Sequence, residues 1–132
     1  MKNDTKFANY STYIMTAYVE FLESAGARVV PLVVGESKEV TLDKLSKLNG
    51  VLLPGGDGDY MEYGRFIFEK IKEYNDNGTY YPVWGTCMGY EDMAAYVSKQ
   101  GWNILEHFEY SNGSLALEFT KDPRDTQMYG WL

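Results

Sequence analysis

The most informative stretch of the sequence is Tyr80-Tyr81-Pro82-Val83-Trp84-Gly85-Thr86-Cys87-Met88-Gly89-Tyr90-Glu91. Its first half is a short apolar run of the kind found in buried strands, and the residues after it have helical spacing. Between the two halves stands Gly-Thr-Cys-Met-Gly, which fits the G-x-C-x-G form of a nucleophile elbow. The stretch therefore predicts a reactive thiol at the point where a strand ends and a helix begins.

Each residue of this expected elbow has a physical task. Gly85 and Gly89 flank Cys87 in a turn that is too crowded for side chains, which is why glycines stand there. The unsatisfied N–H groups and the dipole at the start of the helix favour a thiolate and a developing oxyanion. A lone cysteine between two glycines also fits a small buried residue at a turn. The five-residue motif by itself leaves both interpretations open.

A second glycine loop follows an earlier apolar run. Residues 50–54 have the pattern of a buried strand, and Gly55 and Gly56 come directly after it. Ligands of parallel sheets bind at the carboxyl ends of the strands, so both loops are expected to face one crevice. The N–H groups of Met88 and of Gly55 or Gly56 are then the expected oxyanion donors. A plain tight turn is the alternative interpretation of the loop.

The remaining sequence alternates between helical and strand-like patterns. We expect helices over about 13–25, 41–48, 63–74 and 89–99, and strands over 27–34, 50–54, 80–84, 102–105 and 115–119. Ser11 or Thr12 is the expected cap of the first helix, with Gly26 just past its end, and Thr41 is the expected cap of the second. The alternation predicts an α/β fold with a doubly wound, mostly parallel sheet and helices on both faces. Residues 1–10 form a polar lead, and 11–132 form one partial domain.

Composition narrows the classes of protein that fit. The chain has 132 residues, of which 45% are hydrophobic and 16% aromatic, and this argues against disorder. A net charge of −7 disfavours a nucleic-acid partner. One cysteine excludes an internal disulfide, no apolar run reaches a membrane span, and no signal peptide is visible. We expect neither a cofactor nor a metal.

Residues 82–91 resemble the elbow of the γ-glutamyl hydrolases, cysteine peptidases of the class I glutamine amidotransferase-like group. Residues 13–31, 49–56 and 78–82 resemble further segments of that family in the same order. The resemblance implies an incomplete flavodoxin-like fold and hydrolysis of γ-glutamyl amide bonds, for example in folate poly-γ-glutamate. It implies that Cys87 is the nucleophile and that Tyr90, Glu91, Gly85 and Gly89 support the site or the substrate. The family is typically lysosomal, vacuolar or secreted.

The sequence also departs from the family pattern. The catalytic histidine of the family stands in a later His-Pro-Glu motif, which this chain does not contain, and His107 does not match it. The strand before the first helix is missing, and Asp125 stands about where relatives carry a second histidine. The chain thus resembles the central portion of a γ-glutamyl hydrolase, and we expect it to be inactive alone.

Three functions remain open at this point. The chain is part of a γ-glutamyl hydrolase acting on a small-molecule or peptide substrate, or a truncated, non-catalytic subunit of a larger assembly, or a glutamine amidotransferase subunit. Glu91 argues against the third, because glutamine is expected there in an amidotransferase. In each case we expect protein partners over the exposed sheet edges and over the apolar C-terminus, residues 128–132.

Overall fold

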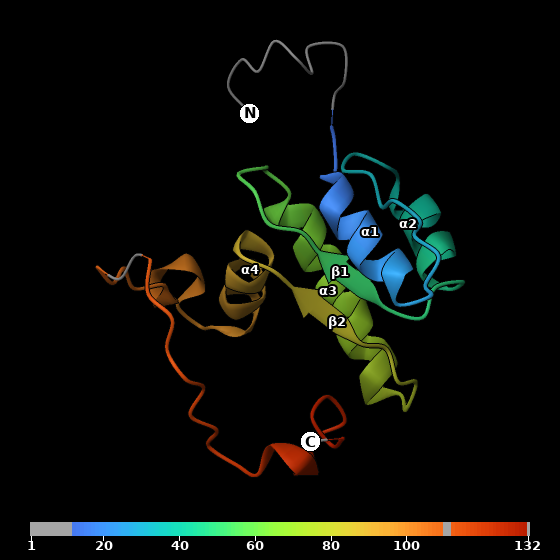
Figure 1. The fold of residues 1–132 in the computed structure, drawn as a ribbon. Helices are drawn as coiled ribbons and strands as arrows, with labels where there is room; N and C mark the ends of the chain where they lie inside the picture. Colours follow the sequence, from blue (N-terminus) through green and yellow to red (C-terminus); the bar gives the residue numbers. More distant parts are fainter. Residues whose placement is uncertain (1–11, 110–111, 132) are drawn as a thin grey trace.

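The computed structural model describes residues 12–109 and 112–131. The elements in chain order are α1 (Thr16–Ser24), α2 (Lys38–Leu45), β1 (Val51–Leu53), α3 (Met61–Asp76), β2 (Val83–Gly85), α4 (Met88–Val97) and two 3-10 turns, η2 (Gly101–Ile104) and η3 (Pro123–Asp125). Figure 1 shows helices gathered around two short strands, with the C-terminal segment running away from them. The predicted polar lead, Ser11 and Leu132 lie outside the described residues.

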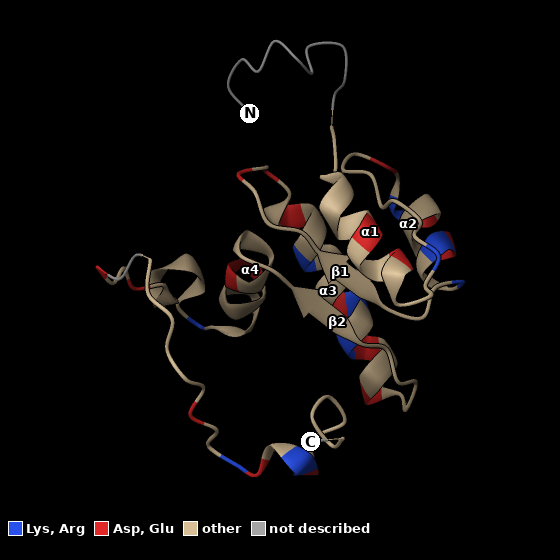
Figure 2. Cartoon of the chain, viewed as in Figure 1, with Lys and Arg blue, Asp and Glu red and all other residues tan. Residues whose placement is uncertain are grey.

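A small parallel sheet stands at the centre of the fold. β1 and β2 pair in parallel, with Val51 opposite Val83 and Leu53 opposite Gly85. Both strands expected before the glycine loops are confirmed, although each is three residues long and the second begins at Val83. Figure 2 shows the two strands free of charged residues, as a sheet between helices requires. The protein is therefore an α/β protein with a small parallel sheet.

The main core joins α2 and α3 to the sheet. Its buried members are Leu45, Ile67, Ile71 and Tyr81. The Tyr81 hydroxyl donates to the carbonyl of Leu45 at 3.1 Å, so its polar end is satisfied. Asn75, near the end of α3, accepts from the N–H of Tyr81 and donates to its carbonyl, at 3.1 and 2.8 Å. This pair of bonds fixes the chain just before it enters β2.

The predicted bounds of helix α3 agree with the structure, whereas the predicted caps of α1 and α2 do not. The expected helix over 63–74 is confirmed as Met61–Asp76, and Gly26 ends α1 with φ +85. The N-cap of α1 is Met15, without a side-chain cap, instead of Thr12. The cap of α2 is Ser37, whose hydroxyl accepts from the N–H of Val40. The predicted cap Thr41 was wrong, because it lies inside the helix.

Three predicted strands are not strands among the described residues. Residues 27–34 and 115–119 have no strand partner, and residues 102–105 overlap η2, which begins at Gly101 with φ +56. A strand needs backbone partners as well as apolar side chains. Leu115 and Leu117 are 77% and 74% exposed, so the alternating pattern of their segment meets no surface to pack on.

Candidate active site

Cys87 stands in the strained turn between β2 and α4. It is the N-cap of α4, with φ 53 and ψ −121, and its side chain is exposed. A non-glycine residue in such a conformation costs about 1–3 kcal/mol and persists only where the surrounding structure enforces it. The alternative of a buried small residue at a turn is therefore wrong, and the thiol is open to a ligand.

Gly85 and Gly89 enforce the turn by their lack of side chains. A Cβ atom on Gly85 would lie 2.6 Å from the carbonyl oxygen of Gly89. A Cβ atom on Gly89 would overlap the carbonyl of Leu53 in β1. The first turn of α4 therefore packs directly on both strands, and this contact sets the position of Cys87.

The second glycine loop comes to the same place. A Cβ atom on Gly55 would lie 2.8 Å from the Cβ atom of Cys87 and 3.1 Å from the carbonyl oxygen of Thr86. Gly56 has φ +136, a conformation that favours glycine, and no atom stands where its Cβ would be. The structure thus brings the 55–56 loop beside Cys87, at the carboxyl ends of β1 and β2.

The backbone N–H groups around the thiol differ in availability. The N–H groups of Met88 and Gly56 donate to no acceptor among the described residues. The N–H of Gly55 instead donates to the hydroxyl oxygen of Tyr18 at 2.9 Å. Two of the three expected oxyanion donors are therefore free, and the third is taken by a residue of α1. The sequence treats Tyr18 as one more apolar position of a helix, so its spacing carries no signal of this role.

The supporting residues named from the sequence lie on the first turn of α4. The N–H groups of Tyr90 and Glu91 donate to the carbonyl of Cys87, at 2.9 and 3.1 Å, and both side chains are exposed. Neither side chain makes a hydrogen bond to another described residue. Both side chains are therefore open to solvent.

Asp92 occupies a different environment from its neighbour. It is 2% exposed, and its Oδ1 atom has no hydrogen-bond partner among the described residues. Burial raises its pKa, and the charge of Glu91 raises it further, whereas the Tyr60 hydroxyl lowers it. Tyr60 in turn donates to the carbonyl of Pro54 at 2.5 Å, and burial followed by the charge of Asp92 raises its pKa. Asp92 is therefore a buried residue of the first turn of α4, whereas Glu91 beside it is exposed.

His107 does not join this site. It is exposed on the segment after η2, and no hydrogen bond connects it with Cys87 or with any other residue that the structure describes. The structure thus places His107 on the surface. The described residues also contain no group of three His, Cys, Asp or Glu side chains arranged to hold a metal ion, and no helix among them is long and apolar enough to cross a membrane.

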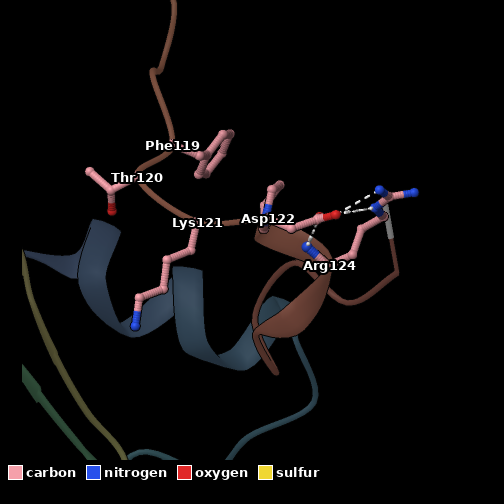
Figure 3. A pocket seen from close by; sticks show the side chains of 6 residues that line it. Phe119, Thr120, Lys121, Asp122 and Arg124 are labelled. Carbon is pink, nitrogen blue, oxygen red and sulfur yellow. Dashed lines mark hydrogen bonds and ion pairs between the residues drawn. The ribbon is translucent and has the colours of Figure 1, made fainter.

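The hollow in Figure 3 is separate from the elbow residues. Six consecutive residues line it, 119–124, all from the C-terminal segment. Arg124 pairs with Asp122 at 2.6 Å and lowers the pKa of that carboxyl. Because one short segment forms the hollow, it brings no catalytic groups together from different elements.

Comparisons with known proteins match the sequence to a family. The family model for peptidase C26 matches residues 1–107. The chain belongs to the peptidase C26 family. It is 43% identical over 122 residues to gamma-glutamyl hydrolase 1 of Arabidopsis thaliana. The matched region covers 90% of this chain and 34% of that protein.

Mammalian gamma-glutamyl hydrolases give similar values. The mouse protein is 40% identical over 94% of this chain and 39% of its own length, and the rat protein is 41% identical over 96% and 40%. The resemblance of residues 82–91 to the γ-glutamyl hydrolase elbow is thereby confirmed at the level of the family. The chain spans between a third and two fifths of the length of these relatives. No solved structure matches.

Proposed function

We propose that this chain carries the nucleophile of a γ-glutamyl hydrolase. The observation that supports this best is the strained, exposed Cys87 beside the free N–H groups of Met88 and Gly56. Backbone strain of this kind costs stability, and residues that carry it cluster at functional sites. Relatives named gamma-glutamyl hydrolase across plants and mammals supply the reaction class.

The reaction begins with the attack of the Cys87 thiolate on the carbonyl carbon of a γ-glutamyl amide. A tetrahedral oxyanion forms, and the N–H groups of Met88 and Gly56 hold it, joined by Gly55 when Tyr18 releases its N–H. The C–N bond then breaks, the amine leaves with a proton, and a γ-glutamyl thioester remains on Cys87. Water hydrolyses the thioester and returns the thiol. Folate poly-γ-glutamate belongs to the proposed substrate class.

The proposed role of this chain stops short of full turnover. A base must form the thiolate and later protonate the leaving amine. No hydrogen bond joins His107 to Cys87, so within the described residues the site holds the proposed nucleophile and oxyanion donors without a histidine base bonded to the thiol. We therefore propose that the chain alone is inactive or very slow, and that a base from outside the described residues completes the site.

The proposed fold follows the same logic. The two-stranded parallel sheet is the centre of a doubly wound, flavodoxin-like sheet of the class I glutamine amidotransferase-like group, and residues 11–132 form one partial domain of it. Parallel sheets normally have both faces and both edges covered. The exposed apolar residues Val30 and Val34, at 44% and 41%, fit a sheet that is incomplete here.

A covalent trapping experiment tests the proposal. The chain is incubated with γ-glutamyl p-nitroanilide and, separately, with the α-glutamyl isomer, and intact-protein mass spectrometry follows the thioester. We expect a γ-glutamyl adduct on Cys87, no adduct with the α isomer, and none on the Cys87→Ser variant. Iodoacetamide supplies the measure of thiol reactivity. Slow alkylation at the rate of a free cysteine peptide, without any adduct, would instead support the non-catalytic subunit.

A further inference from the structure

A buried carboxyl that the proposed reaction does not use lies close to the thiol in the chain. Asp92 stands near the start of α4 and is 2% exposed. Its Oδ1 atom has no hydrogen-bond partner among the described residues, and the side-chain partner of the carboxyl is the Tyr60 hydroxyl. Burying a charge with so few partners is costly, so this environment favours the neutral acid more than water does.

Tyr60 connects this carboxyl to the loop beside the thiol. Its hydroxyl donates to the carbonyl of Pro54 at 2.5 Å. Pro54 comes directly before Gly55, whose backbone lies against the Cβ atom of Cys87. Gly56 follows with a free N–H group. A single hydroxyl therefore stands between the buried carboxyl and the backbone that we propose for holding the oxyanion.

The position of Tyr60 is fixed by the start of α3. The N–H of Gly64 donates to the Tyr60 carbonyl at 2.7 Å, and a Cβ atom on Gly64 would lie 3.2 Å from the Tyr60 ring. The neighbouring hydroxyl of Tyr96 donates to the carbonyl of Met61 at 2.9 Å, so its hydrogen is already used. The Tyr60 hydroxyl is therefore the donor for which Pro54 and the carboxyl compete.

The charged and titratable groups around this pair come from three helices. They are Glu91 and Tyr96 on α4, Tyr60 and Arg65 at the start of α3, and Tyr18 on α1. Burial and the charge of Asp92 raise the pKa of both Tyr60 and Tyr96, so these hydroxyls keep their hydrogens when Asp92 titrates. Arg65 lies over the ring of Tyr96, 4.9 Å from its centre, and donates to the Tyr96 carbonyl.

The protonation state of Asp92 decides which bond Tyr60 makes, because a hydroxyl has a single hydrogen to donate. A protonated Asp92 donates its own hydrogen to the Tyr60 oxygen, and Tyr60 keeps its bond to Pro54. An ionised Asp92 is a stronger acceptor than a neutral carbonyl and takes the Tyr60 hydrogen. The carbonyl of Pro54 then loses its donor.

We propose that Asp92 is a positioning residue of the thiol site: protonated, it lets Tyr60 hold the loop at residues 54–56 in place, and ionised, it releases that loop. The inference rests on the proposed function only in treating the N–H groups of this loop as oxyanion donors. The coupling itself is a property of the folded chain and is measured without turnover. Its failure and the failure of the proposed function are therefore separate results.

Two variants with opposite expected results test the coupling in the whole chain. NMR follows the amide signals of Gly55 and Gly56 and the carboxyl carbon of Asp92 from about pH 4 to about pH 8. In the parent protein we expect the amide signals to move with the Asp92 midpoint. Asp92→Asn keeps a side-chain donor without the charge, so the amide signals should stay at their low-pH positions. Tyr60→Phe removes the donor to Pro54, so they should stay at their high-pH positions.

Glu91→Gln changes the titration and leaves the hydrogen-bonded groups intact. Glu91 is exposed, and its charge raises the pKa of Asp92. Removing this charge should lower the midpoint of the Gly56 signal without moving its two end positions. Formation of the γ-glutamyl adduct is the second readout. At neutral pH we expect it to be about tenfold faster in Asp92→Asn than in Tyr60→Phe, because only the former holds the proposed oxyanion donors in place.

Four results would overturn the inference. Signals of Gly55 and Gly56 that stay still across the pH range would show that no carboxyl is coupled to the loop. Displacement in the same direction in Asp92→Asn and Tyr60→Phe would show an effect of packing alone. A titration that survives in Asp92→Asn would belong to another acid, such as Asp57. Equal adduct rates in these two variants would show that the position of the loop does not serve the reaction.

Discussion

The hydroxyl oxygen of Tyr18 accepts a hydrogen bond from the backbone N–H of Gly55 at 2.9 Å. The two residues are 37 positions apart, and the bond ties α1 to the loop beside Cys87. It occupies an N–H group that lies beside Cys87 and that we propose as an oxyanion donor. The position of α1 and the state of the thiol site are therefore linked through a single side chain.

Tyr18→Phe should release this N–H. We expect amide exchange at Gly55 to become faster and the free energy of unfolding to fall by about 1 kcal/mol, the usual net value of one hydrogen bond. Exchange by NMR and urea unfolding measure the two effects. Tyr90→Phe is the control, because Tyr90 is 66% exposed and its hydroxyl bonds to no described residue. Unchanged exchange at Gly55 would contradict the link.

Gly89→Ala should disturb the packing of α4 on the sheet. The new methyl group would overlap the Leu53 carbonyl, and overpacking of this kind costs about 1–3 kcal/mol or more. Thermal and urea unfolding measure the loss. Gly58→Ala is the matched control, since its Cβ would meet only a Tyr60 ring carbon at 3.8 Å. Equal stability of the two variants would mean that α4 moves freely relative to β1.

Cys87→Gly should stabilise the protein relative to Cys87→Ala. Both remove the sulfur, but only glycine adopts φ 53 and ψ −121 without strain. Relief of about 1–3 kcal/mol exceeds the extra unfolded-state entropy of glycine, about 0.4–1 kcal/mol. The comparison is made by urea unfolding at neutral pH. If the alanine variant is the more stable of the two, the turn is not strained.

Asp92→Asn should change how stability depends on pH. Burial raises the pKa of Asp92 in the folded state, so the folded protein binds the proton more tightly than the unfolded chain does. This contribution is fully present below the unfolded pKa, about 3.9, and is lost as pH rises through the raised folded value. We expect the stability of Asp92→Asn relative to the parent protein to increase between pH 4 and 7.

Urea unfolding across that range measures the difference between the two proteins. Asp57→Asn is the control, because Asp57 is exposed in the loop before α3. A difference that stays constant with pH would show that Asp92 keeps its ordinary pKa when buried.

Local patterns were enough to predict the parts of the fold that depend on neighbours along the chain. Gly85 and Gly89 around Cys87 predicted the turn, because only residues without side chains fit there. The apolar runs before both glycine loops predicted β1 and β2. The helical spacing after residue 61 gave α3. The helical spacing of α3 and the close approach of Gly85 to Gly89 are set within a few residues, so the local pattern records them.

Contacts between distant segments could not be predicted in this way. The run at 27–34 has the composition of a strand, but strands form only beside a partner, and none stands there among the described residues. Thr41 was predicted as a helix cap, yet it is buried inside α2. Its hydroxyl forms a hydrogen bond with that of Tyr63, 22 residues further along the chain, at 2.8 Å. Nothing in the spacing of α1 indicates that Tyr18 reaches Gly55.

The sequence by itself determined the glycine-flanked turn at Cys87 and the family. These follow from residues close together in the chain, whose steric limits are the same in any surroundings. Only the tertiary structure decided which N–H groups around Cys87 are free and that Asp92 is buried. Hydrogen bonds and desolvation depend on which distant groups come within a few ångströms, and that is fixed only when the helices pack on the sheet.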